Sequence, residues 1–478
     1  MTKSFTFTAV VFLAVLASRS LFLFFPSSFH FSYEEAHQGI LALHLGRGLV
    51  LPLGDYAYES YAGGTVFSGL LAALPFKIFG PTLFALRLPS LILSAAGAAC
   101  YAFAFYRYAG PLAGIAAAIV LTVYPPYPAS MDVTAFGNHA ELASLGGALF
   151  LLFARVVFDK RKAGIASAAL LGAAVGFCVY YDHLAVLFLP AAIAVWIWTQ
   201  KKGLAARGAA GFLAGMAAGL STSFLTGGPV LLVKRIFGFA ETPPGGVWPE
   251  SPNFLLASTG LSTGGSIALL AFVAGCAAAW LALNRRGLTR ETRPENLELC
   301  VLLVAAAYVG AVAALRPHAP ARYALPVWPL LAVVPAMLAR RGKAWILPSL
   351  VLAAVALAGW PAHLRAKVEP ALFERGYSYR LFLPTYAHHR AIGARARKLI
   401  DEAEANDPWD AEDLYEGYVI GHAALSGRDV RGHLRALTRP DGTLPEKFIE
   451  GVRRAYADAG GSAPTGRDQF PADFFNDE

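Results

Sequence analysis

Long apolar segments recur along the first three quarters of the chain, and they decide what kind of fold is open to it. A helix needs about 20 mainly apolar residues to cross a bilayer, because lipid offers no partners to the backbone N–H and C=O groups. Such segments lie at residues 5–25, 83–105, 110–128, 140–158, 164–181, 184–200, 208–225, 265–283, 299–315, 323–339 and 343–360. The sequence therefore predicts an all-α polytopic membrane protein with about eleven transmembrane helices.

The composition agrees with this class. Of the 478 residues, 56% are hydrophobic and only 15% are charged, whereas a soluble domain carries about 25% charged residues. The four cysteines, Cys100, Cys178, Cys276 and Cys300, lie inside apolar segments without metal-type spacing. We expect them to pack, and we expect neither a disulfide framework nor a zinc site.

A twelfth apolar stretch, residues 62–80, determines the predicted topology. Cytoplasmic loops of membrane proteins hold an excess of Lys and Arg. If this stretch lies along the membrane surface, the strong basic clusters all lie on the cytoplasmic side of the membrane. They include Lys160-Arg161-Lys162, Arg285-Arg286 and Arg340-Arg341. We therefore predict amphipathic surface helices in the first outer loop, a cytoplasmic N-terminus and an extracytoplasmic C-terminus.

Acidic residues gather on the predicted outer side of the bundle. They are Glu34, Glu35, Asp55, Glu59, Asp132, Glu141, Asp182, Glu241 and Glu250. A carboxylate near the apolar slab costs up to about 3 kcal/mol unless it is paired or hydrated, so the gathering predicts a polar chamber at this end. The other interpretation is that the outer loops are simply polar.

The composition changes after Pro361. The last 118 residues hold 19 of the 32 acids and 16 of the 40 bases, with amphipathic helical patterns. We predict a transmembrane domain over residues 1–360 and a small, mostly helical extracytoplasmic tail over residues 361–478.

Several motifs stand at the outer ends of the predicted spans. Glu34-Glu35 and His37 follow the first span, and Glu59 comes later in the same loop. Asn138-His139-Ala140-Glu141 opens the fourth span, and Arg316-Pro317-His318 precedes Arg322-Tyr323 and Pro326 near the later spans. In this order the segments resemble the GT-C superfamily of membrane glycosyltransferases, in particular the protein mannosyltransferase and lipid A aminoarabinose transferase branch.

The resemblance implies a GT-C-type bundle, a sugar donor on polyprenyl phosphate, and roles for individual residues. Catalytic roles fall to Glu34, Glu35 and Glu59, although the family usually has Asp where Glu34 stands. Transfer to an alcohol needs a base for the hydroxyl proton and positive charge for the departing phosphate. We expect Glu34 or Glu35 to be the base, and we expect the phosphate to bind Arg316, His318, Arg322 and Tyr323.

Other polar residues at the same mouth are candidates for substrate binding, because sugar hydroxyls favour such groups. They are Asn138, His139, Glu141, Asp182 and His183. Polar helix entries are the alternative interpretation. A divalent metal is left open as a cofactor, with Glu34, His37, Glu59 and His139 as ligand candidates, against an interfacial histidine without a ligand role. Arg19, inside the first span, is expected to make a structural ion pair.

The sequence predicts an integral membrane glycosyltransferase of the bacterial inner membrane and cell envelope. It would transfer a sugar from polyprenyl phosphate to a lipid, glycan or protein hydroxyl on the outer face, and the family resemblance implies inversion at the anomeric carbon. The alternative is a polytopic transporter or lipid flippase without chemistry. No Walker loop, dinucleotide fingerprint or nucleic-acid patch is present, so neither ATP nor nucleic acid is an expected partner.

Overall fold

The computed structural model contains helices as its regular elements. It describes residues 2–24, 35, 38, 39, 41–43, 45, 53, 62–80, 82–158, 165–190, 192–194, 202–226, 228, 230, 232, 233, 254–284, 294–315, 321–364, 414, 417, 418, 420, 421, 424, 425, 430, 431, 434, 444 and 446–458. Of the described residues, 92% are helical and none lies in a strand. The predicted all-α class is confirmed.

The chain divides into two compact units. The first comprises Met1–His30 and Arg87–Pro370, and the second comprises Phe31–Leu86 and Ala371–Glu478. The second unit thus contains both the first predicted outer loop and the tail. The boundary at residue 360 stays a prediction.

Eight helices in the described ranges are long and apolar enough to cross a membrane. They are Ser4–Leu23, Leu83–Tyr108, His139–Phe158, Gly208–Leu225, Thr263–Asn284, Asn296–Leu315, Ala321–Arg341 and Lys343–Pro361. Shorter apolar helices occupy Gly63–Phe79, Pro111–Thr122, Ile165–Tyr181 and His183–Ala194. Each of the eleven predicted spans therefore coincides with an apolar helix, and the protein is an integral membrane protein.

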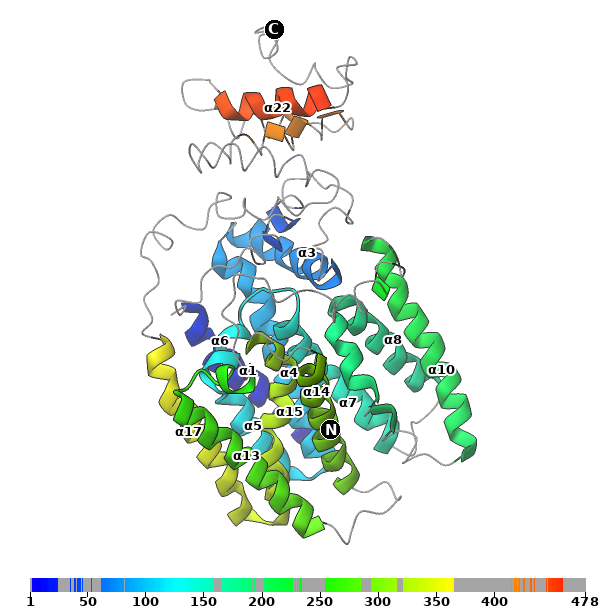
Figure 1. The fold of residues 1–478 in the computed structure, drawn as a ribbon, viewed down its shortest axis with the longest axis vertical. Coiled ribbons are helices and arrows are strands. Elements are labelled where there is room, and N and C mark those ends of the chain that lie inside the picture. The colour runs from blue at the N-terminus through cyan, green and yellow to red at the C-terminus, as the bar shows by residue number, and fades with distance from the viewer. Residues whose placement is uncertain are drawn as a thin grey trace. The chain divides into compact units, whose positions relative to one another are not determined.

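Figure 1 labels most of the longer helices. The helices of the first unit are α1 (Thr2–Phe24), α4 (Leu83–Tyr108, which begins in the second unit), α5 (Pro111–Thr122), α6 (Pro126–Met131), α7 (His139–Phe158), α8 (Ile165–Tyr181), η2 (His183–Phe188), α10 (Lys202–Leu220), η3 (Ser221–Thr226), α12 (Phe254–Ala257), α13 (Thr263–Asn284), α14 (Pro294–Leu315), η4 (Ala321–Val327), α15 (Trp328–Ala332), α16 (Val334–Leu338), η5 (Ala339–Arg341), η6 (Lys343–Ile346) and α17 (Leu347–Leu364). In the second unit the helices with established bounds are α3 (Ala62–Phe79) and α22 (Glu446–Asp458), and residues 38, 39 and 41–43 are also helical.

Two predicted spans are interrupted where prolines remove backbone donors. The segment at 110–128 is two helices, α5 and α6, because Pro125 and Pro126 end one and start the other. The segment at 323–339 runs through η4, α15 and α16, with Pro326, Pro329 and Pro335 at the joints. This broken segment is 83% buried, so it lies in the core of the bundle.

Glycines bring α8 and α10 into backbone contact, and the two helices lie side by side (Figure 1). A Cβ on Gly215 would overlap the carbonyl oxygen of Ala169, and a Cβ on Gly172 would overlap that of Phe212. Small residues at such spacing allow close approach in lipid, where hydrophobic burial does not drive helices together. The pair therefore packs as one stiff element.

Arg19 ties α1 to the broken end of α5. Its side chain is 1% exposed, and its guanidinium donates to the carbonyl oxygens of Leu121 at 2.9 Å and Thr122 at 3.0 Å. Its Nε lies 3.4 Å from Asp132 Oδ2, which also accepts from Ser94 Oγ at 3.0 Å. The expected structural ion pair is confirmed, and its partner is Asp132.

In the second unit, α22 has a buried apolar face. Phe448, Val452 and Tyr456 form a core with Ile420, Ala424, Val430 and Leu434. The opposite face carries Glu450, which pairs with Lys447 at 2.9 Å and Arg454 at 3.0 Å. All described residues of the tail except Val430 and Leu444 are helical, as the sequence predicts.

Candidate functional site

His139 and Asp182, which are 43 residues apart, meet at one end of the first unit. His139 is the first residue of α7, and Asp182 follows the last residue of α8. His139 Nδ1 donates to Asp182 Oδ2 across 2.6 Å, and both side chains are 0% exposed. A charge-assisted bond of this length fixes the orientation of the imidazole ring.

Asp182 also starts the next helix. Its Oδ1 accepts from the backbone N–H of Leu184 at 2.9 Å, which caps η2, and lies 3.8 Å from His183 Nδ1. Burial pushes the pKa of Asp182 upward, but the charge and hydrogen bond of His139, followed by the effects of His183 and the Leu184 N–H, lower it overall. Asp182 is therefore an ionised anchor for two histidines.

Tyr323 of η4 brings the later part of the chain to the same place. Its ring lies 4.7 Å from the His139 ring, centroid to centroid, and its backbone carbonyl accepts from Tyr308 Oη at 2.8 Å. Arg322 precedes it and is half-buried. The structure thus joins His139, Asp182, His183 and Tyr323 into one buried cluster, which we call the His139–Asp182 cluster.

Glu141 is buried and fully engaged at the start of α7. Its carboxylate accepts from Ser90 Oγ at 3.0 Å and from the backbone N–H groups of Gly137 at 3.1 Å and Asn138 at 3.2 Å. The bond from the Asn138 N–H to a carboxylate three residues later is one half of a capping box. These bonds hold the turn that carries Asn138 and His139, and the predicted substrate role of Glu141 stays a prediction.

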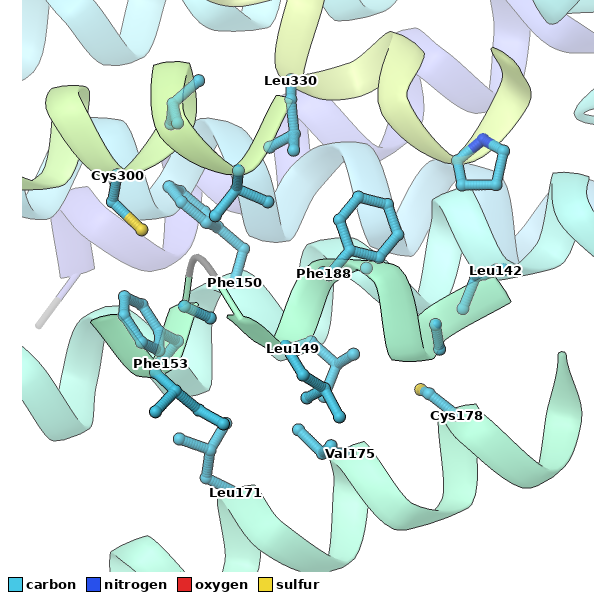
Figure 2. A pocket seen from close by; sticks show the side chains of 18 of the residues that line it. Leu142, Leu149, Phe150, Phe153, Leu171, Val175, Cys178, Phe188, Cys300 and Leu330 are labelled. Carbon is cyan, nitrogen blue, oxygen red and sulfur yellow. The ribbon is translucent and has the colours of Figure 1, made fainter. Parts of the chain in front are cut away.

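An apolar cavity of about 120 Å³ lies between α7, α8, η2 and α14. Figure 2 shows Leu171, Val175 and Cys178 of α8 on one side, with Cys300 and Leu330 on the opposite side. Aromatic rings from α4, α7, η2 and α10 also line the cavity: Tyr101, Phe150, Phe153, Phe188 and Phe212. Lining residues of α7 run from Leu142 to Phe153, about 16 Å at the rise of an α-helix.

One end of this cavity borders the His139–Asp182 cluster. Leu142, Ala185 and Pro326 line the cavity. They come one helical turn or less after His139, His183 and Tyr323, respectively. A ligand with an apolar chain in the cavity would therefore have its polar end close to the two histidines.

The described residues include only part of the predicted site. Glu34, His37, Glu59, Arg316 and His318 lie outside them. Glu35, in the second unit, is described and is 0% exposed. Of the metal candidates only His139 is described, and no group of three metal-binding side chains occurs in the ranges given above. The catalytic, phosphate-binding and metal assignments stay predictions.

The acidic residues that the sequence places on the outer side are buried wherever the structure describes them. Glu35, Asp132, Glu141 and Asp182 are at most 8% exposed. Sequence reasoning did not find the partners Ser90, Ser94 and Tyr308, because a lone Ser or Tyr in an apolar segment gives no signal of its own. The cavity was missed for the same reason, since its residues are those of any core.

No protein-family model and no curated protein sequence matches the chain. The structure is similar to the crystal structure of ArnT from Cupriavidus metallidurans bound to undecaprenyl phosphate, with a TM-score of 0.50 and 16% sequence identity over 95% of this chain and 76% of that one. ArnT is a GT-C membrane protein. The chain has the GT-C fold. At this identity the likeness extends to the fold alone, and membership of the superfamily and of its branch stays a prediction.

Proposed function

We propose that this protein is an integral membrane glycosyltransferase that takes a sugar from a polyprenyl-phosphate donor. The acceptor would be a hydroxyl of a lipid, glycan or protein on the outer face of the bacterial inner membrane. The N-terminus would then be cytoplasmic and the tail extracytoplasmic, as the basic clusters predict.

The observation that carries the proposal is the position of the apolar cavity beside the His139–Asp182 cluster. Pockets with an apolar body and a few convergent polar groups suit amphiphilic ligands. A polyprenyl chain matches the apolar part, and a phosphate or sugar matches the polar end. The fold of ArnT, whose crystal structure contains undecaprenyl phosphate, supports the same class of ligand.

The chemistry divides among residues of this chain. Glu34 or Glu35 would take the proton from the acceptor hydroxyl, with Glu59 assisting. Arg322, together with Arg316 and His318, would stabilise the leaving phosphate, and Tyr323 would position it. His139, oriented by Asp182, would donate from its imidazole to the same headgroup. Because the phosphate leaves well, no separate acid is required.

The test uses purified protein in bilayer discs with radiolabelled sugars on polyprenyl phosphate. Release of polyprenyl phosphate is measured for wild type, Glu34→Gln and Glu35→Gln. We expect one of the two variants to lose at least 100-fold in turnover, because a positioned base contributes about 10²–10⁴-fold. Full turnover in both would remove the acid pair as the base.

A matched pair of variants on α8 tests the cavity. Val175→Phe fills the cavity, whereas Leu170→Phe adds the same bulk at a position that is 57% exposed. We expect Val175→Phe to raise the KM for the donor and Leu170→Phe to leave it unchanged. Equal behaviour of the two variants would place the lipid chain elsewhere. A wild type that moves lipid between leaflets while leaving every donor intact would favour the flippase.

A further inference from the structure

Gln38 is a buried polar residue whose hydrogen bonds are not made within the described part of the protein. Its side chain is 0% exposed, and neither Nε2 nor Oε1 has a hydrogen-bond partner there. A buried amide that lacks partners costs free energy, because folding removes it from water without replacement bonds. Such groups are rare in native folds, so this one requires an explanation.

The backbone holds Gln38 in place. A Cβ on Gly69 of α3 would lie 3.0 Å from the Gln38 carbonyl oxygen and 2.9 Å from Leu41 Cβ. The helical turn with Gln38 and Leu41 is therefore pressed against α3, and only a glycine fits at the crossing. Since the backbone cannot withdraw, the amide stays where it is buried.

Two buried residues near Gln38 along the chain and along α3 have side chains of the kind that bind polyhydroxylated ligands. Glu35 precedes Gln38 by three residues, is also helical and is also 0% exposed. Thr65 lies one turn before Gly69 on the face of α3 that meets Gln38, and it is 3% exposed. A carboxylate, an amide and a hydroxyl offer both donors and acceptors, as neighbouring sugar hydroxyls require, and none of them carries the positive charge that a phosphate would need.

We propose that Gln38 is a sugar-binding residue, whose amide donates to one hydroxyl of the transferred sugar or of a glycan acceptor and accepts from another. The inference rests on the proposed function and deepens it, because it assigns recognition of the sugar to a residue three positions after Glu35. The amide is closed to water, so the sugar reaches it by displacing the side chains that cover it. The ligand then supplies the bonds that the fold lacks.

The variant Gln38→Leu separates this role from a structural one. Leucine has nearly the same volume and no polar atoms. A residue whose amide bonds only to ligand can be replaced without loss of thermal stability, whereas a residue with a structural partner cannot. Ser349→Ala is the matched control, because Ser349 in α17 is 0% exposed and its hydroxyl also has no partner among the described residues.

Two ligands distinguish binding of sugar from binding of lipid: polyprenyl phosphate with and without the sugar. We expect Gln38→Leu to bind the sugar-bearing lipid about ten-fold more weakly and the sugar-free lipid as wild type does, with a melting temperature at or above that of wild type. If the affinity for both lipids is unchanged and only the KM for a glycan acceptor rises, the acceptor is the sugar that Gln38 binds. We expect Ser349→Ala to change none of these values.

Other results would overturn the inference. A lowered melting temperature in Gln38→Leu would show that the amide has a structural partner. Unchanged affinities together with an unchanged acceptor KM would leave Gln38 no role in binding, while wild-type turnover would keep the proposed function intact. A wild type that neither binds the lipids nor cleaves the donor would remove the proposed function, and this inference with it.

Discussion

Replacing Arg19 with Met tests how the centre of the bundle is held together. Arg19 Nε and Asp132 Oδ2 are 3.4 Å apart, so their gross attraction is about 5 kcal/mol at an effective dielectric constant of about 20. Removing one partner of a buried pair costs about 3–5 kcal/mol, because the other charge stays behind without compensation. The variant also leaves the carbonyl oxygens of Leu121 and Thr122 without their donors.

The cost should depend on pH because Asp132 can accept a proton. Burial raises the pKa of Asp132 from 3.8 to about 6, against the opposing effects of Arg19 and the Ser94 hydroxyl. A raised pKa means that this carboxyl favours the folded state below about pH 4 and loses that contribution as the pH rises through about 6. Without Arg19 the pKa rises further, so the loss extends to higher pH.

We therefore expect Arg19→Met to lower the free energy of unfolding by about 3–5 kcal/mol at pH 8. At pH 5 the carboxyl of the variant is neutral, and the loss should fall to about 2 kcal/mol, the contribution of the two carbonyl bonds. Adding Asp132→Asn should restore most of the difference between the two pH values. Reversible unfolding in mixed lipid–detergent micelles, followed by tryptophan fluorescence, measures the wild type and both variants.

The same loss at pH 5 and pH 8 would refute this reasoning, because it would mean that the charge of Asp132 is not what Arg19 compensates. A double variant no more stable than Arg19→Met at pH 8 would refute it as well. Either result would mean that Arg19 acts only as a hydrogen-bond donor to the carbonyl oxygens at the end of α5.

Three further predictions concern other parts of the protein. Gly215→Ala should lower the free energy of unfolding by about 1–3 kcal/mol, because its Cβ would overlap the backbone of α8. The control Gly275→Ala in α13, which has open space around it, should change the free energy of unfolding by less than about 1 kcal/mol. Chemical unfolding compares the two variants, and equal effects would contradict the close packing of α8 and α10. Gly451→Ala should make the tail sensitive to limited proteolysis, since its Cβ would overlap the Leu414 carbonyl oxygen; unchanged resistance would argue against that crossing. Asp182→Asn should lower turnover and shift the pH–rate profile, because His139 loses its anionic partner, and a wild-type profile would exclude His139 from the reaction.

The positions of the helices could be predicted from the sequence, but the side-chain contacts between them could not. Apolar length identified all eight helices of the described ranges that are long enough to cross a membrane, because lipid leaves a spanning backbone few alternatives. The breaks after α5 and within residues 321–338 were readable from Pro125 and Pro326, although length alone suggested continuous spans. The contact between His139 and Asp182 was not readable, because it depends on where the end of α8 meets the start of α7.

The buried charges of the first unit bear on the choice between enzyme and transporter. A transporter commonly uses the ends of broken helices to coordinate its substrate. Here the broken end of α5 is capped by Arg19, and the carboxylate of Glu141 is engaged by Ser90 and two backbone N–H groups. These charges serve the fold, so they are not available to a passing ion.

The cavity argues in the same direction. A flippase must give the polar headgroup of its lipid a path across the apolar slab, because an uncompensated charge is costly there. The lining of this cavity is apolar over the length of α7 from Leu142 to Phe153, and polar groups border it at the His139–Asp182 cluster. A cavity of this form can hold a lipid chain while its headgroup stays at one end. Because holding the headgroup in one place is what a transferase requires and a flippase must avoid, the geometry favours the enzyme.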